Sequence, residues 1–181
     1  MFFYFSQVKA KSKRFVFAAL VLVLLAAFLS GCKTEPEDDT NYEGELPAGL
    51  IGKWVFDKDN WYEIQESGGS YKLIYTAIFD DPEWGYFDYS FEGDIEFISN
   101  YSSNSGIIIV KYTYGEYDDT KPYTGIYYRE ITSSTVKLAN VWDLKKKDSA
   151  DTTTLEEAID KFTRSKTGKY VGYWGTYLLD E

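Results

Sequence analysis

Few residues of this chain could do covalent or metal chemistry. Cys32 is the single cysteine among 181 residues, and the sequence contains no histidine. Without histidine, neither a Ser-His-Asp triad nor a Cys-His pair can form, and ordinary zinc sites are excluded as well. Carboxylate pairs remain possible, but 29 acidic residues are more simply interpreted as a solvated surface. We therefore predict no catalytic residue, no metal and no cofactor, and do not expect an enzyme.

The residues before Cys32 have the pattern of an export signal. Residues 1–14 contain four basic residues and no acidic one, and residues 15–30 form an apolar block. A basic segment, an apolar segment and then small residues are typical of a secretory signal. The block is shorter than the about 20 apolar residues that span a membrane. We therefore predict a signal peptide over residues 1–31.

The end of this block, Leu29-Ser30-Gly31-Cys32, resembles the lipobox of bacterial lipoproteins. In that class the cysteine thiol takes a diacylglyceryl group, the signal is removed, and the new amino terminus is usually acylated. The resemblance implies that Cys32 is the lipid attachment site and that its acyl chains hold the protein on a membrane of the cell envelope. Lys33 follows, where an aspartate would favour the inner membrane in some bacteria, so the outer membrane or cell surface is favoured.

Charge and composition divide the remainder of the chain. Without its signal the chain has 15 basic and 29 acidic residues, a net charge of −14, which disfavours binding to nucleic acid. Residues 33–48 are acidic and poor in apolar side chains, so together with Cys32 they are predicted to form a disordered tether over 32–48. Residues 49–181 are long enough for one folded domain.

Apolar and polar residues alternate in that domain. From 87 to 97 the odd positions are apolar or glycine and the even positions are polar, which predicts a strand with one buried and one wet face, bent at Gly93. Residues 71–79 repeat the pattern, and the turn at 67–70 connects them to the strand before. Six further strands are predicted over residues 52–57, 61–66, 106–114, 123–132, 135–143 and 169–179.

One helix is predicted before the last strand. Thr153 and Glu156 have the spacing of a capping box, with Thr153 as the N-cap. Apolar residues at 155, 158, 159 and 162 would share one helix face. Gly168 is placed to end the helix.

Eight strands and one helix, with Gly52-Lys53-Trp54 in the first strand, are similar to the lipocalins and their relatives, the calycins. The resemblance implies an antiparallel up-and-down barrel in which Gly52 and Trp54 close one end. The family's Thr-Asp-Tyr segment is missing, no arginine follows Arg164, and the helix precedes the eighth strand instead of following it. An antiparallel sandwich is the alternative fold.

A lipocalin-like barrel implies a small-molecule site inside it. The candidate ligand-binding residues are those on the apolar face of two central strands, Tyr75, Phe87, Tyr89 and Phe91. The expected function is a membrane-anchored lipoprotein that binds a small apolar or aromatic-compatible ligand. The alternative is a surface adhesin or partner-binding lipoprotein with no ligand, which would use exposed tyrosines. Whether the interior is filled or hollow is left open by the sequence.

Overall fold

The computed structural model describes residues 43–81, 85–115, 117–171 and 173–180. All of them belong to one compact unit of the chain. The predicted signal peptide (1–31), Cys32 and most of the predicted tether lie outside the described residues. No helix within the described residues is long and apolar enough to cross a membrane.

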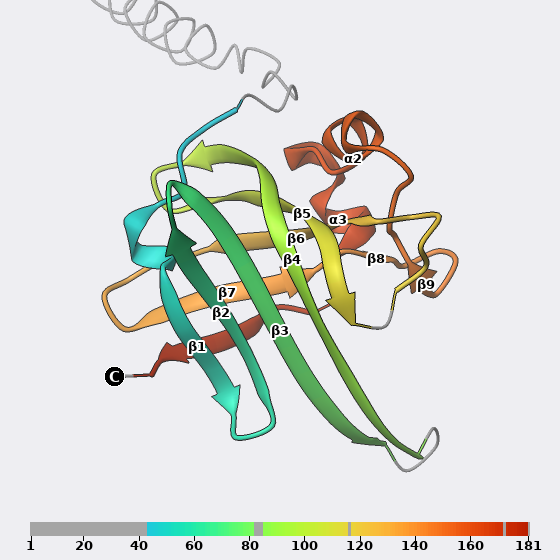
Figure 1. Ribbon diagram of the computed structural model, residues 1–181, viewed down its shortest axis with the longest axis horizontal. Coiled ribbons are helices and arrows are strands. Elements are labelled where there is room, and N and C mark those ends of the chain that lie inside the picture. Colours follow the sequence, from blue (N-terminus) through green and yellow to red (C-terminus); the bar gives the residue numbers. More distant parts are fainter. Residues whose placement is uncertain (1–42, 82–84, 116, 172, 181) are drawn as a thin grey trace, which may run out of the picture. The chain divides into compact units, whose positions relative to one another are not determined.

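Eight antiparallel strands close into a barrel, in the order β1-β10-β7-β6-β5-β4-β3-β2 (Figure 1). Each barrel strand pairs with the barrel strands that precede and follow it in the chain, as in an up-and-down barrel. The last strand, β10, pairs with β7 and with β1, which closes the barrel. The prediction of a closed barrel is confirmed, and the sandwich is excluded. The barrel strands are β1 (Gly52–Asp57), β2 (Asn60–Ser67), β3 (Ser70–Asp81), β4 (Gly85–Ser102), β5 (Ser105–Gly115), β6 (Tyr123–Arg129), β7 (Thr135–Asn140) and β10 (Gly175–Leu179).

The apolar residues of the barrel form two cores because β5 and β6 are buried on both faces. Ile108 and Ile126 point into the barrel and belong to the inner core. Their neighbours Ile107 and Tyr127 belong to an outer core beneath the helices. The elements outside the barrel are η1 (Ala48–Leu50), β8 (Trp142–Asp143), β9 (Asp148–Ser149), α2 (Leu155–Lys161), η2 (Arg164–Lys166) and α3 (Thr167–Tyr170).

The longest strand, β4, does not keep the predicted alternation to its end. The register shifts at Gly93, where a side chain would collide with Val110, as the predicted bend requires. A second shift lies between Ile95 and Phe97. Beyond it Ile98 joins the inner core and Phe97 packs on the outer one. The prediction that Phe97 shares the buried face of Phe91 is therefore wrong, because the extra residue reverses the faces.

The helix was predicted at the right place with the wrong ends. Thr154, not Thr153, is the N-cap, and its hydroxyl accepts a hydrogen bond from the Glu157 amide at 3.1 Å. The Glu157 carboxylate accepts from the Thr153 amide in return, at 3.0 Å. Thr153 and Thr154 each have a glutamate three residues later, Glu156 and Glu157, so the sequence allows the capping box in either register. Helix α2 ends at Lys161, and Gly168 lies within the separate short helix α3.

Three other strands are shorter than predicted. Glu130 adopts a positive φ of 56° and ends β6 at Arg129, three residues before the predicted end. The strand predicted over 135–143 ends at Asn140, and Trp142 and Asp143 form the separate short strand β8. Residues 169–171 are helical or extended instead of forming part of the last strand, which begins at Gly175.

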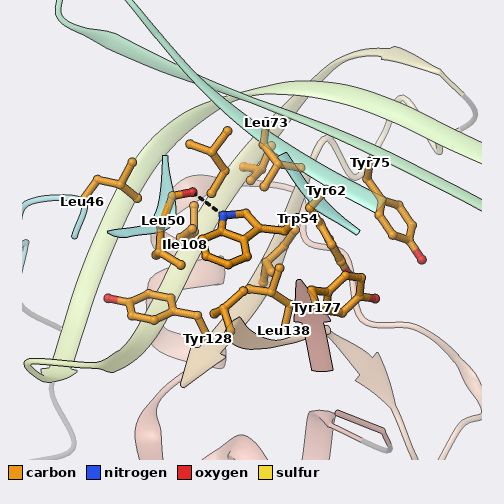
Figure 2. Close-up of a cluster of buried hydrophobic side chains, with 14 of the residues drawn as sticks. Leu46, Leu50, Trp54, Tyr62, Leu73, Tyr75, Ile108, Tyr128, Leu138 and Tyr177 are labelled. Atoms are coloured by element: carbon orange, nitrogen blue, oxygen red, sulfur yellow. Dashed lines mark hydrogen bonds between the residues drawn. The ribbon is translucent and has the colours of Figure 1, made fainter. Parts of the chain in front are cut away.

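One end of the barrel is closed by Trp54. The indole is 1% exposed, and its Nε1–H donates a hydrogen bond of 2.9 Å to the Leu50 carbonyl. Figure 2 shows Leu50, Ile108, Tyr128 and Leu138 around the ring. Gly52 has φ +130°, which a side chain would rarely adopt. The structure thus places Gly52 and Trp54 at the end of the barrel where the first strand begins.

The residues just before β1 also lie on this end. Leu46 is buried in the inner core. The Gly44 amide donates to the Ile98 carbonyl at 2.7 Å, and the Asn100 side-chain amide donates to the Glu45 carbonyl at 2.9 Å. Residues 43–48 were assigned to the tether, but they are packed against the barrel and belong to the folded domain.

Candidate functional site

The opposite end of the barrel is hollow. It is the end at which β7 stops and β6 and β10 begin, and we call it the open end. Two adjoining cavities lie here, of about 430 and 470 Å³. Tyr75, Asn140 and Trp142 line both. The interior of the barrel is therefore filled beneath the Trp54 end and empty at the other.

Aromatic rings in contact with one another separate the filled part from the hollow part. Tyr62 is central, with its ring centroid 4.5 Å from Tyr75 and 5.0 Å from Tyr177. Tyr75 continues the contact to Phe91 at 5.4 Å, and Phe91 to Tyr112 at 4.9 Å. These five residues, which we call the aromatic belt, come from five different strands. Tilted and edge-to-face pairs of this kind stabilise the fold beyond the area that they bury.

The first cavity is bounded by uncharged side chains. Aromatic residues dominate its wall, and Phe56, Trp142 and Tyr173 are 46%, 46% and 71% exposed. Asn60 also lines this cavity, and its amide oxygen is buried without a hydrogen-bond partner among the described residues. Its amide nitrogen donates to the Asp57 carboxylate at 2.7 and 2.9 Å, which fixes the side chain. The wall is formed by Phe56, Asn60, Tyr62, Tyr75, Leu138, Ala139, Asn140, Trp142, Tyr173, Gly175 and Tyr177.

The second cavity combines aromatic residues with two carboxylates. Asp151 is partly buried, and its Oδ2 accepts a hydrogen bond from the Tyr112 hydroxyl at 3.2 Å. Asp88 is exposed. The position of Asp151 is set by its neighbour Thr152, which pairs with Tyr123 at the start of β6 through backbone bonds of 2.9 and 3.2 Å. The wall is formed by Tyr75, Asp88, Tyr89, Phe91, Tyr112, Thr124, Asn140, Val141, Trp142, Ser149 and Asp151.

Burial keeps the hydroxyls of the belt neutral. Desolvation, reinforced by the neighbouring hydroxyls of Tyr75 and Tyr177, raises the pKa of Tyr62 well above its ordinary value. Burial also raises the pKa of Tyr177 to about 12, and burial together with the nearby Asp151 raises the pKa of Tyr112. These groups therefore remain hydrogen-bond donors at neutral pH. The Tyr62 hydroxyl donates a hydrogen bond of 2.9 Å to the Asn140 amide oxygen.

Three of the four residues predicted to bind a ligand lie at the cavities. Tyr75 lines both, and Tyr89 and Phe91 line the second. Phe87 is in β4, and its side chain lies outside the described part of the structure. Asp88 and Ser90 are exposed, as predicted for the wet face, while Glu92 is half-buried beside Lys72 at 3.1 Å.

Residues from connections complete the open end, and the sequence analysis missed them. Trp142 and Asp151 come from the segment between β7 and α2, and Tyr173 from the segment before β10. Trp142 was assigned to a strand that ends before it. An isolated tryptophan, tyrosine or aspartate outside a periodic strand gives no signal of its position, although Trp142 and Tyr173 stand out afterwards as large exposed side chains.

The described residues give no support for a metal site. Among them, no three acidic side chains converge in a way that could hold a metal ion. The acidic turn between β1 and β2 is closed by its own bonds, since the Asp57 carboxylate accepts from the Asp59 amide at 2.9 Å as well as from Asn60.

No family model, curated protein or solved structure matches this chain. The closed eight-stranded antiparallel barrel, with Gly52 and Trp54 in its first strand, is compatible with a lipocalin-like fold.

Proposed function

We propose that this protein binds one small, flat and largely apolar molecule at the open end of a lipocalin-like barrel, while lipid on Cys32 holds it on a membrane of the cell envelope. The observation that supports binding is the pair of adjoining cavities walled by aromatic rings. Their volumes fall in the range of about 300–1,000 Å³ that small-molecule sites occupy. The aromatic faces suit a planar partner.

The exposed aromatic residues at the cavities support the same proposal. Phe56, Trp142 and Tyr173 present large apolar surfaces to solvent, and all three line the first cavity. A bound molecule would cover part of these surfaces and gain about 25 cal/mol per Å² of apolar area removed from water. Their clustering at one cavity favours a ligand over an unrelated surface role.

The anchor is supported by sequence alone. The lipobox-like residues 29–32 and the apolar block before them favour lipidation of Cys32, and Lys33 favours the outer membrane or the cell surface. Two or more acyl chains give stable membrane attachment. We propose a binding role instead of catalysis because histidine and a free thiol are missing from the mature sequence.

The second candidate is a partner-binding or adhesin function without a small ligand. Tyr86 and Tyr114 are 68% and 70% exposed, and neither is among the residues that line the two cavities. Exposed tyrosines of this kind can anchor protein interfaces. The two candidates therefore place the important aromatic residues in different parts of the surface.

A pair of alanine variants separates the candidates. N-phenyl-1-naphthylamine, an uncharged apolar fluorophore, is titrated against the wild type, Trp142→Ala and Tyr114→Ala. We expect saturable fluorescence enhancement at about one dye per chain, weakened at least fivefold, about 1 kcal/mol, by Trp142→Ala and unchanged by Tyr114→Ala. Both removed side chains are exposed aromatics, so the comparison controls for loss of apolar surface. Absence of saturable binding, or equal weakening by the two variants, would contradict the site.

A further inference from the structure

The two cavities differ in charge. The first has no ionisable acid or base in its wall apart from tyrosine. The second contains the carboxylates of Asp88 and Asp151. Neither lysine nor arginine is among the described residues that line the two cavities. The open end is therefore an aromatic site with negative charge on one side and no positive side chain facing it.

Asp151 has no positive partner of its own. In the described part of the chain, no ion pair includes this carboxylate. The nearby Lys161 lowers its pKa less than the hydrogen bonds from Ser149, Thr124 and Tyr112 do, and the ammonium is directed elsewhere. It donates to the Ala150 carbonyl at 2.6 Å and lies 5.6 and 5.7 Å from the ring centroids of Phe162 and Tyr170 in the outer core.

The environment of this carboxylate is costly for a charge. Burial raises the pKa of Asp151, and the hydrogen bonds from Ser149, Thr124 and Tyr112 offset this in part. Buried acidic groups without a cationic partner are uncommon in proteins, because desolvation of the charge is uncompensated. A positively charged ligand in the cavity would supply the missing partner.

The aromatic walls beside Asp151 are suited to a cation as well. Phe91 and Tyr112 meet edge to face at 4.9 Å, and Tyr89 and Trp142 line the same space. The faces of aromatic rings carry partial negative charge and attract ammonium groups, most strongly where water is excluded. A carboxylate and several rings around one cavity form the usual elements of an organic-ammonium site.

We propose that the ligand is an organic cation, with its ammonium group in the second cavity near Asp151 and its uncharged planar body extending past Tyr75 into the first. This rests on the proposed function and names the chemical class of the ligand.

A matched series of indoles tests the charge assignment. Tryptamine, tryptophol and indole-3-acetate share one planar body and carry a positive, a neutral and a negative side chain at pH 7. Binding is measured by equilibrium dialysis with the full chain in phosphatidylcholine vesicles, and protein-free vesicles are the blank. We expect tryptamine to bind at least tenfold more tightly than tryptophol, and indole-3-acetate to bind more weakly than both.

Two isosteric variants identify the carboxylate responsible. Asp151→Asn keeps an oxygen that can accept from Tyr112, so we expect it to bind tryptophol as the wild type does and to reduce the preference for tryptamine to within threefold. Asp94→Asn, which alters an exposed acid of β4 that is not among the residues lining the two cavities, should change the preference by no more than about twofold. The midpoint of thermal unfolding of each variant shows whether it is folded.

The outcomes separate the two proposals. Equal binding of tryptamine and tryptophol to the wild type would overturn the cation assignment and leave a binding site for neutral molecules. A tenfold preference that survives Asp151→Asn would overturn the role of this residue. If none of the three indoles binds while N-phenyl-1-naphthylamine does, the ligand class is wrong, and if the dye also fails to bind, the proposed function is wrong too.

Discussion

Replacing Trp54 with phenylalanine tests the account of the closed end. The indole Nε1–H is the hydrogen-bond partner of the Leu50 carbonyl, at 2.9 Å, and the ring is 1% exposed. Phenylalanine would leave that carbonyl buried and unpaired, which costs about 1–3 kcal/mol. The smaller ring would also leave a void that adds about 1 kcal/mol. Trp54→Phe should therefore lower the free energy of unfolding by about 2–4 kcal/mol.

The matched control is Trp61→Phe. Trp61 precedes Tyr62 in β2, so it points away from the interior, and it is half-buried with Lys53 Nζ 5.0 Å from its ring centroid. Loss of this cation–π contact on the outer face is worth about 0.5–1 kcal/mol. Urea unfolding followed by far-ultraviolet circular dichroism gives both free energies without relying on tryptophan fluorescence. The reasoning is refuted if Trp61→Phe is the more damaging substitution, or if Trp54→Phe costs less than about 0.5 kcal/mol.

Three further predictions concern the core, the charge and the anchor. Phe91→Ala should lower the free energy of unfolding by about 2–3 kcal/mol. This is less than the about 3–5 kcal/mol of a fully packed phenylalanine, because the second cavity already adjoins the ring. Asp88→Ala should change it by no more than about 0.5 kcal/mol, and denaturant unfolding that reverses this order would show that the strand register is wrong. Because burial raises the pKa of Asp151 in the folded state, ionisation of this carboxyl destabilises the fold. Ligand-free Asp151→Asn should therefore unfold at a higher temperature than the wild type at pH 7. The difference should vanish as the pH falls below 3.8, the ordinary pKa of an aspartate. A variant less stable at pH 7 would count against an unpaired carboxylate. Cys32→Ser should abolish metabolic labelling with a palmitate analogue, whereas equal labelling of both proteins would end the lipoprotein interpretation.

The strands could be predicted from the sequence because they are regular, whereas their closure into a barrel was implied by the resemblance to the lipocalins, with a sandwich as the alternative. Alternation with a period of two is imposed by the geometry of a strand with one face on a core, and it identified the paired faces of β3 and β4 through Tyr75 and Phe91. The glycine pair at 68 and 69, with φ of 62° and 82°, marked the turn between β2 and β3. Short connections make consecutive antiparallel strands neighbours, but the pairing of β10 with β7 and β1, which closes the barrel, has no local signal in the sequence.

The errors lie where tertiary contacts overrule the local pattern. The bulge in β4 that places Phe97 on the outer core has no sequence mark of its own, since Glu96 continues the alternation. The end of β7 is followed by Trp142 and Asp143, which pair with β9 outside the barrel, and no local rule anticipates this change of partner. The strand residues of the site were therefore predictable, while Trp142, Asp151 and Tyr173 depend on the paths of connecting segments.

The most direct test of the central claim is native mass spectrometry of the protein purified from its own cells. We expect a fraction of the protein to carry one additional molecule, with a mass on the order of a few hundred daltons as suits cavities of this size. The bound fraction should fall sharply in Trp142→Ala and remain unchanged in Tyr114→Ala, because only the first side chain lines the cavities. Protein that is free of any small molecule in every preparation, or a bound mass that Trp142→Ala leaves unaffected, would contradict a ligand site at the open end of the barrel.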